Sequence, residues 1–179
     1  PKVRTDSKLE YTTIMHGGGG DAPALLVQSA IVLKDVLLDS NAQGAEIQAQ
    51  GVATTSRNLT ITKTMAEPLT VYPDALFSIP RGGTFTGNTN NWISVPSDDI
   101  TLQGTIANLG VPYRVLGNLD AVRGSALIVE AGTVFEMTPD SHFEVGWNGS
   151  VSAITAVGTP AAPIVFRGIN PAAGSWQGV

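Results

Sequence analysis

The sequence predicts an all-β fold in which short parallel strands stack as a single-stranded right-handed β-helix, or solenoid, of roughly eight rungs. Three observations lead to this prediction. Apolar positions recur about every 22 residues, the apolar runs alternate with period two, and turn-forming residues separate the runs. The 179-residue chain contains 20 Gly and 11 Pro, and no apolar stripe of helical spacing is long enough for a sizeable helix.

The repeat is clearest in the N-terminal third. Ile14, Val36 and Leu59 recur at intervals of about 22 residues in similar contexts, and we expect them to stack in one inward-facing column. A second apolar cluster follows each of them, at Leu25-Leu26-Val27, at Ile47, and at Leu69 with Val71. Leucine-rich repeats share this period, but their fixed pattern of Leu and Asn is missing here.

The second half is equally strand-like, although its repeat is less strict. Strand-turn-strand runs are expected around Gly87-Asn88, around Ala131-Gly132 and around Asn148-Gly149. Asparagine side chains at β-helix turns bond to backbone groups of neighbouring rungs, and we expect this role for five of them: Asn41, Asn58, Asn88, Asn90 and Asn91.

Composition excludes several classes of function. The net charge is −5, and the ten Lys and Arg residues are scattered, so the chain lacks the basic clusters that nucleic-acid binding requires. No apolar stretch is long enough to span a membrane. The absence of Cys excludes disulfides and thiolate metal sites.

Three stretches carry a family resemblance: GVPYRVLGNLDAVRGSALIVEAGTVFEM, GSVSAITAVGTPAAPIVFRG followed by GSWQGV, and SKLEYTTIMHGGGG. They resemble the right-handed parallel β-helix repeats of large secreted or surface-anchored bacterial proteins, which have the fold of the pectate-lyase-like superfamily. The resemblance implies a secreted or cell-surface location. It implies the fold rather than an activity, because unrelated functions share this fold.

In that family the third stretch normally follows the second, whereas here it stands at the N-terminus. We therefore expect residues 1–179 to be one solenoid unit, a period of a longer tandem array, with 1–108 as later rungs of one unit and 109–179 as opening rungs of the next. The expected partners are copies of the same unit, stacked head to tail through exposed strand edges. The residues predicted at these edges are Leu9, Tyr11, Ile14, Trp176 and Val179.

The predicted function is a non-catalytic structural module of an extracellular rod, fibre or adhesin about 40 Å long, without cofactor or metal. His16 and His142 are the only histidines, and a histidine-based metal site would have few partners. The glutamates Glu46, Glu67, Glu130, Glu136 and Glu144 are expected on solvated strand faces.

The alternative is a carbohydrate-active enzyme, a polysaccharide lyase or hydrolase, or a module that binds surface glycans. Such activity needs several carboxylates converging on one face. We expect no carboxylate ladder beside Asp35, because adjacent rungs place Thr13 and Asn58 there. The residues that could carry this alternative are Asp35, Asp39, Asp98, Asp99, Trp92 and Trp147, although turn, cap and surface-covering roles explain them as well.

Overall fold

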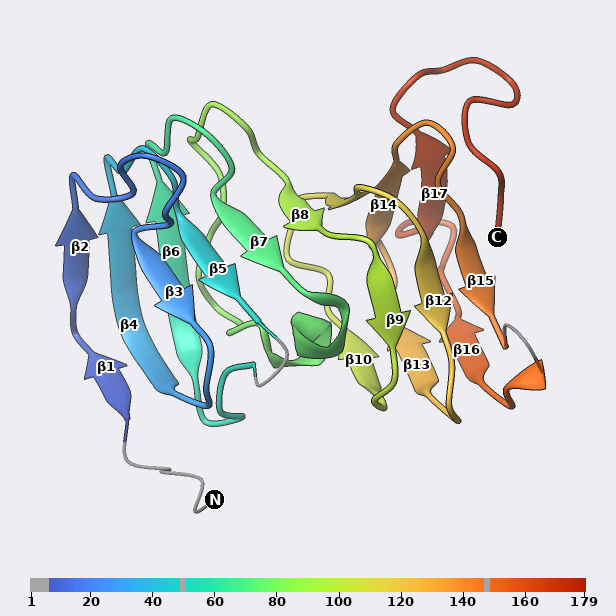
Figure 1. Cartoon of the computed structure of the whole chain (residues 1–179), viewed down its shortest axis with the longest axis horizontal. Helices are drawn as coiled ribbons and strands as arrows, with labels where there is room; N and C mark the ends of the chain where they lie inside the picture. Colours follow the sequence, from blue (N-terminus) through green and yellow to red (C-terminus); the bar gives the residue numbers. More distant parts are fainter. Residues whose placement is uncertain (1–6, 49–50, 147–148) are drawn as a thin grey trace.

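The computed structural model describes residues 7–48, 51–146 and 149–179 and shows a parallel β-solenoid (Figure 1). The predicted all-β stacked architecture is confirmed, but the solenoid has about six turns rather than eight. Dividing the chain length by 22 overestimates the number because the turns differ in length. The turn from β14 (Val134–Met137) to β17 (Val165–Gly168) is much longer than 22 residues, and partial turns lie at both ends.

One seven-stranded parallel sheet runs the length of the molecule (Figure 1). Its order is β17-β14-β11-β8-β7-β5-β3, so each strand pairs with its equivalent one turn away. Besides β14 and β17, it contains β3 (Leu25–Val27), β5 (Ala45–Ile47), β7 (Leu69–Val71), β8 (Ile93–Val95) and β11 (Tyr113–Val115). The predicted second apolar cluster forms its first three strands, in which Val27, Ile47 and Val71 are in register.

The N-terminal turns add one further sheet. It contains β1 (Lys8–Glu10), β2 (Thr13–Met15), β4 (Val32–Asp39) and β6 (Arg57–Thr62). Strands β1 and β2 both pair with β4, and β6 pairs with the other edge of β4. Each N-terminal turn therefore contributes to two sheets, one of which bends at Asp35 between the part of β4 that pairs with β1 and the part that pairs with β2.

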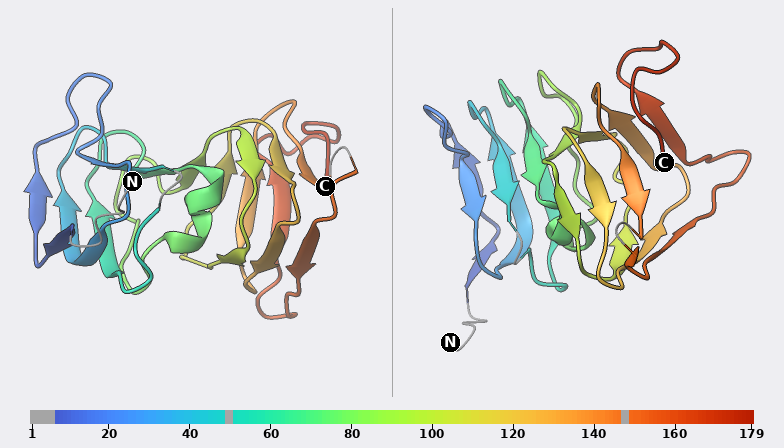
Figure 2. Two further views of the ribbon diagram at one scale, coloured as in Figure 1. Left: turned by 60° about the horizontal axis from the view of Figure 1, so that its bottom comes forward. Right: turned by 45° about the vertical axis from the view of Figure 1, so that its right-hand side comes forward.

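The C-terminal turns have three sides, because two three-stranded sheets accompany the long one (Figure 2). The first contains β9 (Asp98–Ile100), β12 (Leu119–Ala121) and β15 (Phe143–Val145), and the second contains β10 (Gly104–Ile106), β13 (Ala126–Val129) and β16 (Ala153–Ala156).

The short 3-10 helix η1 (Pro73–Ser78) lies where the number of sheets rises from two to three, and it packs against β9 and β10. The Asp74 carboxylate accepts hydrogen bonds from the Thr101 backbone N–H at 2.6 Å and from the Leu102 N–H at 3.1 Å. This carboxylate thereby satisfies backbone donors at the end of β9, where the new sheet begins.

The predicted column of Ile14, Val36 and Leu59 is wrong, because Ile14 pairs with a residue two positions further along β4 than expected. Ile14 is in register with Leu38 and Ile61, whereas Val36 faces Leu59 in a separate inward column. The first turn spans 24 residues, from Ile14 to Leu38, two more than the expected 22, and the next spans 23, from Leu38 to Ile61. Because side chains alternate with period two, a shift of two residues keeps Ile14 on the inner face.

Two columns of left-handed backbone run through the N-terminal turns. The first bends the N-terminal sheet within its strands: positive φ occurs at Tyr11 between β1 and β2, at Asp35 inside β4, at Asn58 inside β6, and at Gly82 on the next turn. The second column, at His16, Ser40, Lys63 and Gly87, follows the strands, and only one residue of each column is glycine. The first column also places Tyr11, not the expected Thr13, beside Asp35, since the Tyr11 N–H donates to the Lys34 carbonyl.

Buried asparagines hold the turns that follow the second column. Asn41 accepts a hydrogen bond from the Gly17 N–H at 2.8 Å and donates to the Ile14 carbonyl at 3.0 Å. Asn88 accepts from the Thr64 N–H and donates to the Ile61 and Phe85 carbonyls, each at 2.9 Å. The predicted asparagine role is confirmed at these two positions.

The other three asparagines behave differently. Asn58 donates to the Asp35 carboxylate at 2.6 Å, and Asn91 bonds to the backbone of Asn88 within its own turn. No side-chain hydrogen bond to a neighbouring turn is found for Asn90 within the described part of the chain.

Aromatic rings fill the core of the C-terminal turns. Phe135 stacks on Tyr113 at 5.6 Å and on Phe166 at 4.8 Å between ring centroids, and Phe143 lies 5.8 Å from both Phe135 and Phe166. The buried Tyr113 hydroxyl donates to the Ala107 carbonyl at 2.7 Å. Across the described residues, no helix is both long and apolar enough to cross a membrane.

Candidate functional site

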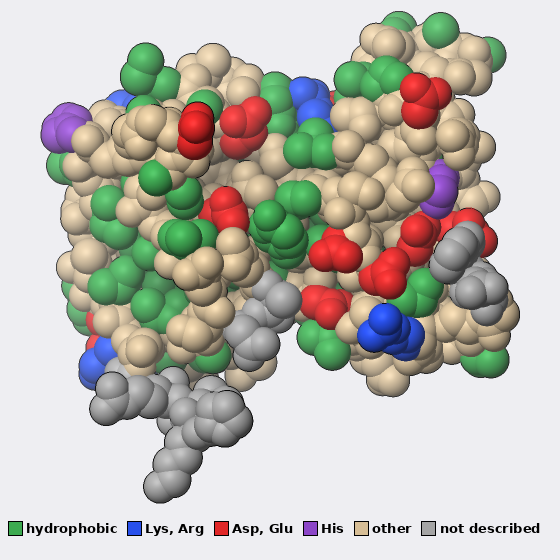
Figure 3. Space-filling view, in the orientation of Figure 1, with side chains coloured by type: hydrophobic (Ala, Val, Ile, Leu, Met, Phe, Trp, Pro, Cys, Tyr) green, Lys and Arg blue, Asp and Glu red, His purple; other side chains and the backbone are tan. Residues whose placement is uncertain are grey.

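A column of carboxylates crosses the sheet formed by β9, β12 and β15. Asp99, Asp120 and Glu144 are directly in register on these three strands. The neighbouring positions Ile100, Ala121 and Leu119 are buried, so the column lies on the outer face of the sheet. Figure 3 shows acidic side chains gathered over these strands.

His142 adds a nitrogen ligand to this column. It precedes β15, and its Nε2 atom lies 2.9 Å from Asp120 Oδ1 and 3.9 Å from Glu144 Oε2. The three residues offer atoms that all lie within 4.8 Å of one another. The side chains of His142 and Asp120 are about one-fifth exposed, and that of Glu144 is about half exposed, so solvent reaches one side of the group.

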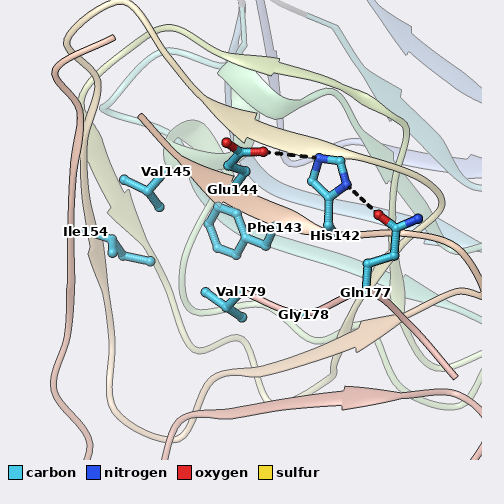
Figure 4. Close-up of a pocket in the computed structure, with 8 residues that line it drawn as sticks. All are labelled: His142, Phe143, Glu144, Val145, Ile154, Gln177, Gly178 and Val179. Atoms are coloured by element: carbon cyan, nitrogen blue, oxygen red, sulfur yellow. Dashed lines mark hydrogen bonds and ion pairs between the residues drawn. The ribbon is translucent and has the colours of Figure 1, made fainter. Parts of the chain in front are cut away.

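The orientation of the His142 ring is set by Gln177. The Oε1 atom of Gln177 lies 3.3 Å from His142 Nδ1 (Figure 4). An amide oxygen only accepts hydrogen bonds, so this contact is a hydrogen bond in the tautomer that carries a proton on Nδ1. Nε2 therefore faces the two carboxylates.

The same residues border a cavity of about 600 Å³ at the C-terminal end of the solenoid (Figure 4). Its floor is apolar, from Phe143, Val145 and Ile154, and its rim is polar, from His142, Glu144 and Gln177. The segment that carries Gln177 pairs with β15, since the Phe143 N–H donates to the Gly178 carbonyl and the Gln177 N–H donates to the Ser141 carbonyl.

Of the residues predicted for the carbohydrate-active alternative, Asp35 and Asp39 form ordinary contacts between turns. Asp35 accepts from Asn58 and pairs with Arg57 at 3.8 Å, and Asp39 pairs with Lys63 at 3.0 Å. These contacts lie on the N-terminal sheet, away from the carboxylate column. The structure does not bring them together with Asp98 and Asp99.

The remaining predicted residues lie at separate places. Asp98 is exposed and accepts a hydrogen bond from the Asp99 N–H at 2.9 Å, which leaves Asp99 as the one predicted residue in the carboxylate column. Trp92 is covered by the Arg114 guanidinium, which lies 3.4 Å from the ring centroid in a cation–π contact. Trp147 lies outside the described residues.

The predicted assembly residues lie at the two ends of the solenoid. At the N-terminal end, Leu9 and Ile14 are partly buried against the core, and Tyr11 is 81% exposed. At the C-terminal end, Trp176 is packed against the core and Val179 is 69% exposed. In the described part of the chain, β1, β2, β3, β16 and β17 each pair along one edge only.

The expectation that Glu136 is solvated is wrong. This glutamate is 9% exposed and lies between Arg114 at 2.6 Å and Arg167 at 2.8 Å, each from a neighbouring turn. Burial would raise the pKa of Glu136, but the two guanidinium groups outweigh that effect and hold the pKa below its ordinary value. Glu130 likewise pairs with Arg81, whose hydrogen bond lowers the pKa of this carboxyl.

Asp120, His142 and Glu144 were not singled out together from the sequence. Two of them, His142 and Glu144, are close in the sequence, but Asp120 comes from β12, one turn earlier. A signal was present, however. Asp99, Asp120 and Glu144 follow the same repeat of about 22 residues as the apolar positions, so applying the period to acidic residues would have aligned them.

Comparisons with family models, with curated proteins and with solved structures found no match to this chain. The β-solenoid fold therefore rests on the structure itself.

Proposed function

We propose that this chain is a non-catalytic structural module of an extracellular or cell-surface rod, fibre or adhesin, continued at its ends by further solenoid turns. The observation that carries the proposal is the C-terminal end of the solenoid. There, β16 and β17 each pair along one edge only, and Ile154 of β16 and the 177–179 segment border the cavity with the apolar floor. A further turn stacked in parallel would pair these edges and cover Val145 and Ile154.

The backbone geometry identifies which groups are available for pairing. The Ala153 N–H donates to the Ser125 carbonyl, and alternate residues of a parallel strand bond to the same neighbour. The N–H groups of Ile154 and Ala156 therefore point away from β13, toward the open edge. The Ala156 side chain is exposed in this structure and is in register with buried Val129, so it lies on the face of β16 that a further turn would cover.

The resemblance to β-helix repeats of secreted and surface-anchored bacterial proteins supports the proposed extracellular location. In those repeats, the motif at 174–179 is followed by the motif at 7–20. We therefore propose that the C-terminal end of one unit meets the N-terminal end of the next, either within one polypeptide or between molecules. Contacts of this kind between unlike ends propagate into a filament instead of closing as a dimer.

A tandem dimer of the chain tests the proposal. If the two copies form one continuous solenoid, six turns at a spacing of about 4.8 Å should lengthen the particle by roughly 29 Å, measured by small-angle X-ray scattering. The tandem should also unfold in a single transition. Ala156→Pro in the first copy should separate the copies into two flexibly joined bodies, because proline removes the edge N–H. Ala156→Val keeps the N–H and is the matched control.

Two independent bodies in the unmodified tandem would contradict the proposal. An Ala156→Pro tandem that scatters like the Ala156→Val tandem would contradict the role of this edge.

A second candidate function is an activity on polysaccharides or binding of surface glycans. The observation that favours it is the column of Asp99, Asp120 and Glu144 with His142 on one sheet face, because a lyase or hydrolase needs carboxylates and a proton acceptor on one surface. Incubation with acidic polysaccharides should then release unsaturated or reducing sugars, and Asp120→Asn should abolish the release. Activity retained in Asp120→Asn would exclude this column as its source.

A further inference from the structure

We propose that Asp120, His142 and Glu144 bind a divalent transition-metal cation, with Zn²⁺ as the representative ion. This inference is independent of the rod proposal. It requires no further solenoid turn, since all three ligands belong to the described chain.

The first argument is the chemistry of the ligand set. One imidazole nitrogen and two carboxylate oxygens lie within 4.8 Å of one another, which allows all three to approach one ion after small side-chain rotations. Imidazole nitrogen favours Zn²⁺ and its neighbours in the first transition row over Ca²⁺ or Mg²⁺, which prefer oxygen ligands alone. Three protein ligands would leave at least one coordination position for water.

The second argument is the direction of the His142 ring. Nδ1 lies 3.3 Å from the Gln177 Oε1 atom, and Nε2 lies 2.9 Å from Asp120 Oδ1 on the opposite side of the ring. When Nδ1 donates to Gln177, Nε2 and the carboxylate oxygen attract each other only through a proton or a cation placed between them. A divalent cation would serve in this place. The Nδ1–H···O contact is also the arrangement that orients metal-binding histidines in general.

The third argument is electrostatic. Three carboxylates on adjacent strands repel one another by about 1 kcal/mol per close pair even in water, and by more where the groups are partly buried. A protonated His142 would offset one negative charge. A divalent cation beside a neutral His142 would offset two, which matches the two carboxylates that the imidazole faces.

Backbone order holds the site together. Asp120 lies on β12, His142 and Glu144 lie on or beside β15, and Gln177 lies on the terminal segment that pairs with β15. The ligands and the residue that orients the histidine therefore lie on three adjacent, hydrogen-bonded segments: β12, β15 and residues 177–179. Bound metal should therefore also stabilise the 177–179 segment against β15.

The experiment is Zn²⁺ titration of the untagged chain by calorimetry and by thermal unfolding, with His16→Asn as the background that removes the other histidine. One Zn²⁺ per chain should bind and raise the melting temperature. Asp120→Asn, His142→Asn and Glu144→Gln should each weaken binding by about tenfold or more. Gln177→Ala, a positioning variant, should weaken binding by about tenfold while leaving the ligands in place.

Asp99→Asn is the matched control, because it removes one charge from the same column without removing a ligand. It should change the Zn²⁺ affinity far less than Asp120→Asn does. An equal loss in the two variants would show general attraction of cations to an acidic face and would overturn the proposal. Failure of the unmodified chain to bind Zn²⁺ would overturn it as well.

Nitrogen NMR of the imidazole provides a readout that does not depend on the stability of any variant. With Zn²⁺ bound, the Nδ1 proton should remain and Nε2 should show the shift of a metal-bound nitrogen. Protonation of both nitrogens at neutral pH in the presence of Zn²⁺ would identify a simple imidazolium–carboxylate pair and overturn the proposal.

Discussion

Successive turns are held together by different interactions in the N-terminal and C-terminal parts of the solenoid. In the N-terminal turns, aliphatic residues such as Leu38 and Ile61 fill a core bordered by two sheets, and the buried amides of Asn41 and Asn88 bond to backbone groups one turn away. In the C-terminal turns, aromatic rings stack along a three-sided core, and the ionic ladder of Arg114, Glu136 and Arg167 crosses the long sheet outside it.

The difference shows which interactions depend on side-chain identity. An asparagine amide at a turn satisfies backbone groups that every turn possesses, so it can recur at any level. The aromatic and ionic stacks instead require matched partners on each neighbouring turn. Substitutions in the C-terminal turns should therefore propagate to adjacent turns more strongly than substitutions in the N-terminal ones.

The largest expected effect comes from the centre of the aromatic stack. Phe135→Ala should reduce the free energy of unfolding by about 4 kcal/mol, because it removes a fully buried ring in contact with Tyr113, Phe143 and Phe166. Ile61→Val, a buried substitution in the N-terminal turns, should cost only about 1 kcal/mol. Urea denaturation of both variants checks the contrast, and equal losses would contradict it.

The asparagine ladder should show the next largest effect. Asn88→Ala should cost about 3 kcal/mol, because it leaves the Thr64 N–H and two carbonyl groups without partners. Hydrogen exchange at the Thr64 amide should accelerate. Asn88→Asp keeps the acceptor for Thr64 but loses the donor, so in this variant Thr64 should remain protected while stability still falls. Loss of Thr64 protection in Asn88→Asp would refute this assignment of the two hydrogen-bonding roles.

The ionic ladder should make the C-terminal turns sensitive to acid. The pKa of Glu136 is lowered in the folded chain, so its stabilising contribution is present above the ordinary glutamate pKa of about 4.3 and is lost as the pH falls through the lowered pKa. Glu136→Gln should cost about 2 kcal/mol at pH 7, where three charge-assisted hydrogen bonds are weakened.

Thermal unfolding between pH 7 and pH 3 measures this effect. The difference in stability between the unmodified chain and Glu136→Gln should shrink toward acid pH. A difference that stays constant over this range would show that the charge of Glu136 does not contribute.

The smallest expected effect concerns the left-handed corners. Ser40 has a φ of 56°, and glycine occupies the equivalent corner at Gly87. Ser40→Gly should change stability by less than about 1 kcal/mol, because glycine tolerates this backbone without a steric penalty but gains entropy in the unfolded chain. Ser40→Val should destabilise by about 1 to 2 kcal/mol. A valine variant as stable as the glycine variant would show that this corner is not strained.

The sequence predicted the stacking because the apolar period is a property of the chain itself. The second apolar cluster of each repeat, at Leu25-Leu26-Val27, at Ile47 and at Leu69 with Val71, lies in β3, β5 and β7 of one sheet. The exact register of Ile14 was not predictable in the same way. It depends on how many residues the loop at 17–20 takes up, and glycine places little constraint on that number.

The candidate site was less predictable than the fold. Asp99 was named, but Asp120, His142 and Glu144 can be recognised as one group only when successive turns are aligned in register. Glu136 was misjudged for the same reason. Its sequence neighbours do not reveal that arginines from the two adjacent turns, Arg114 and Arg167, would enclose it.

The level at which the number of sheets rises from two to three, between β7 and β8, also has a mechanical consequence. Strands β7 and β8 share only two paired residues, whereas β5 and β7, like β8 and β11, share three. At the same level the N-terminal sheet continues without a regular strand, through an isolated bridge between Arg57 and Arg81 and separate hydrogen bonds such as that from the Ile61 N–H to the Thr84 carbonyl. Tension along the solenoid axis loads the hydrogen bonds between turns directly, so the molecule should part first at this level. A stretched rod built from such units would then yield at regular intervals, with the turns on either side of each break still folded.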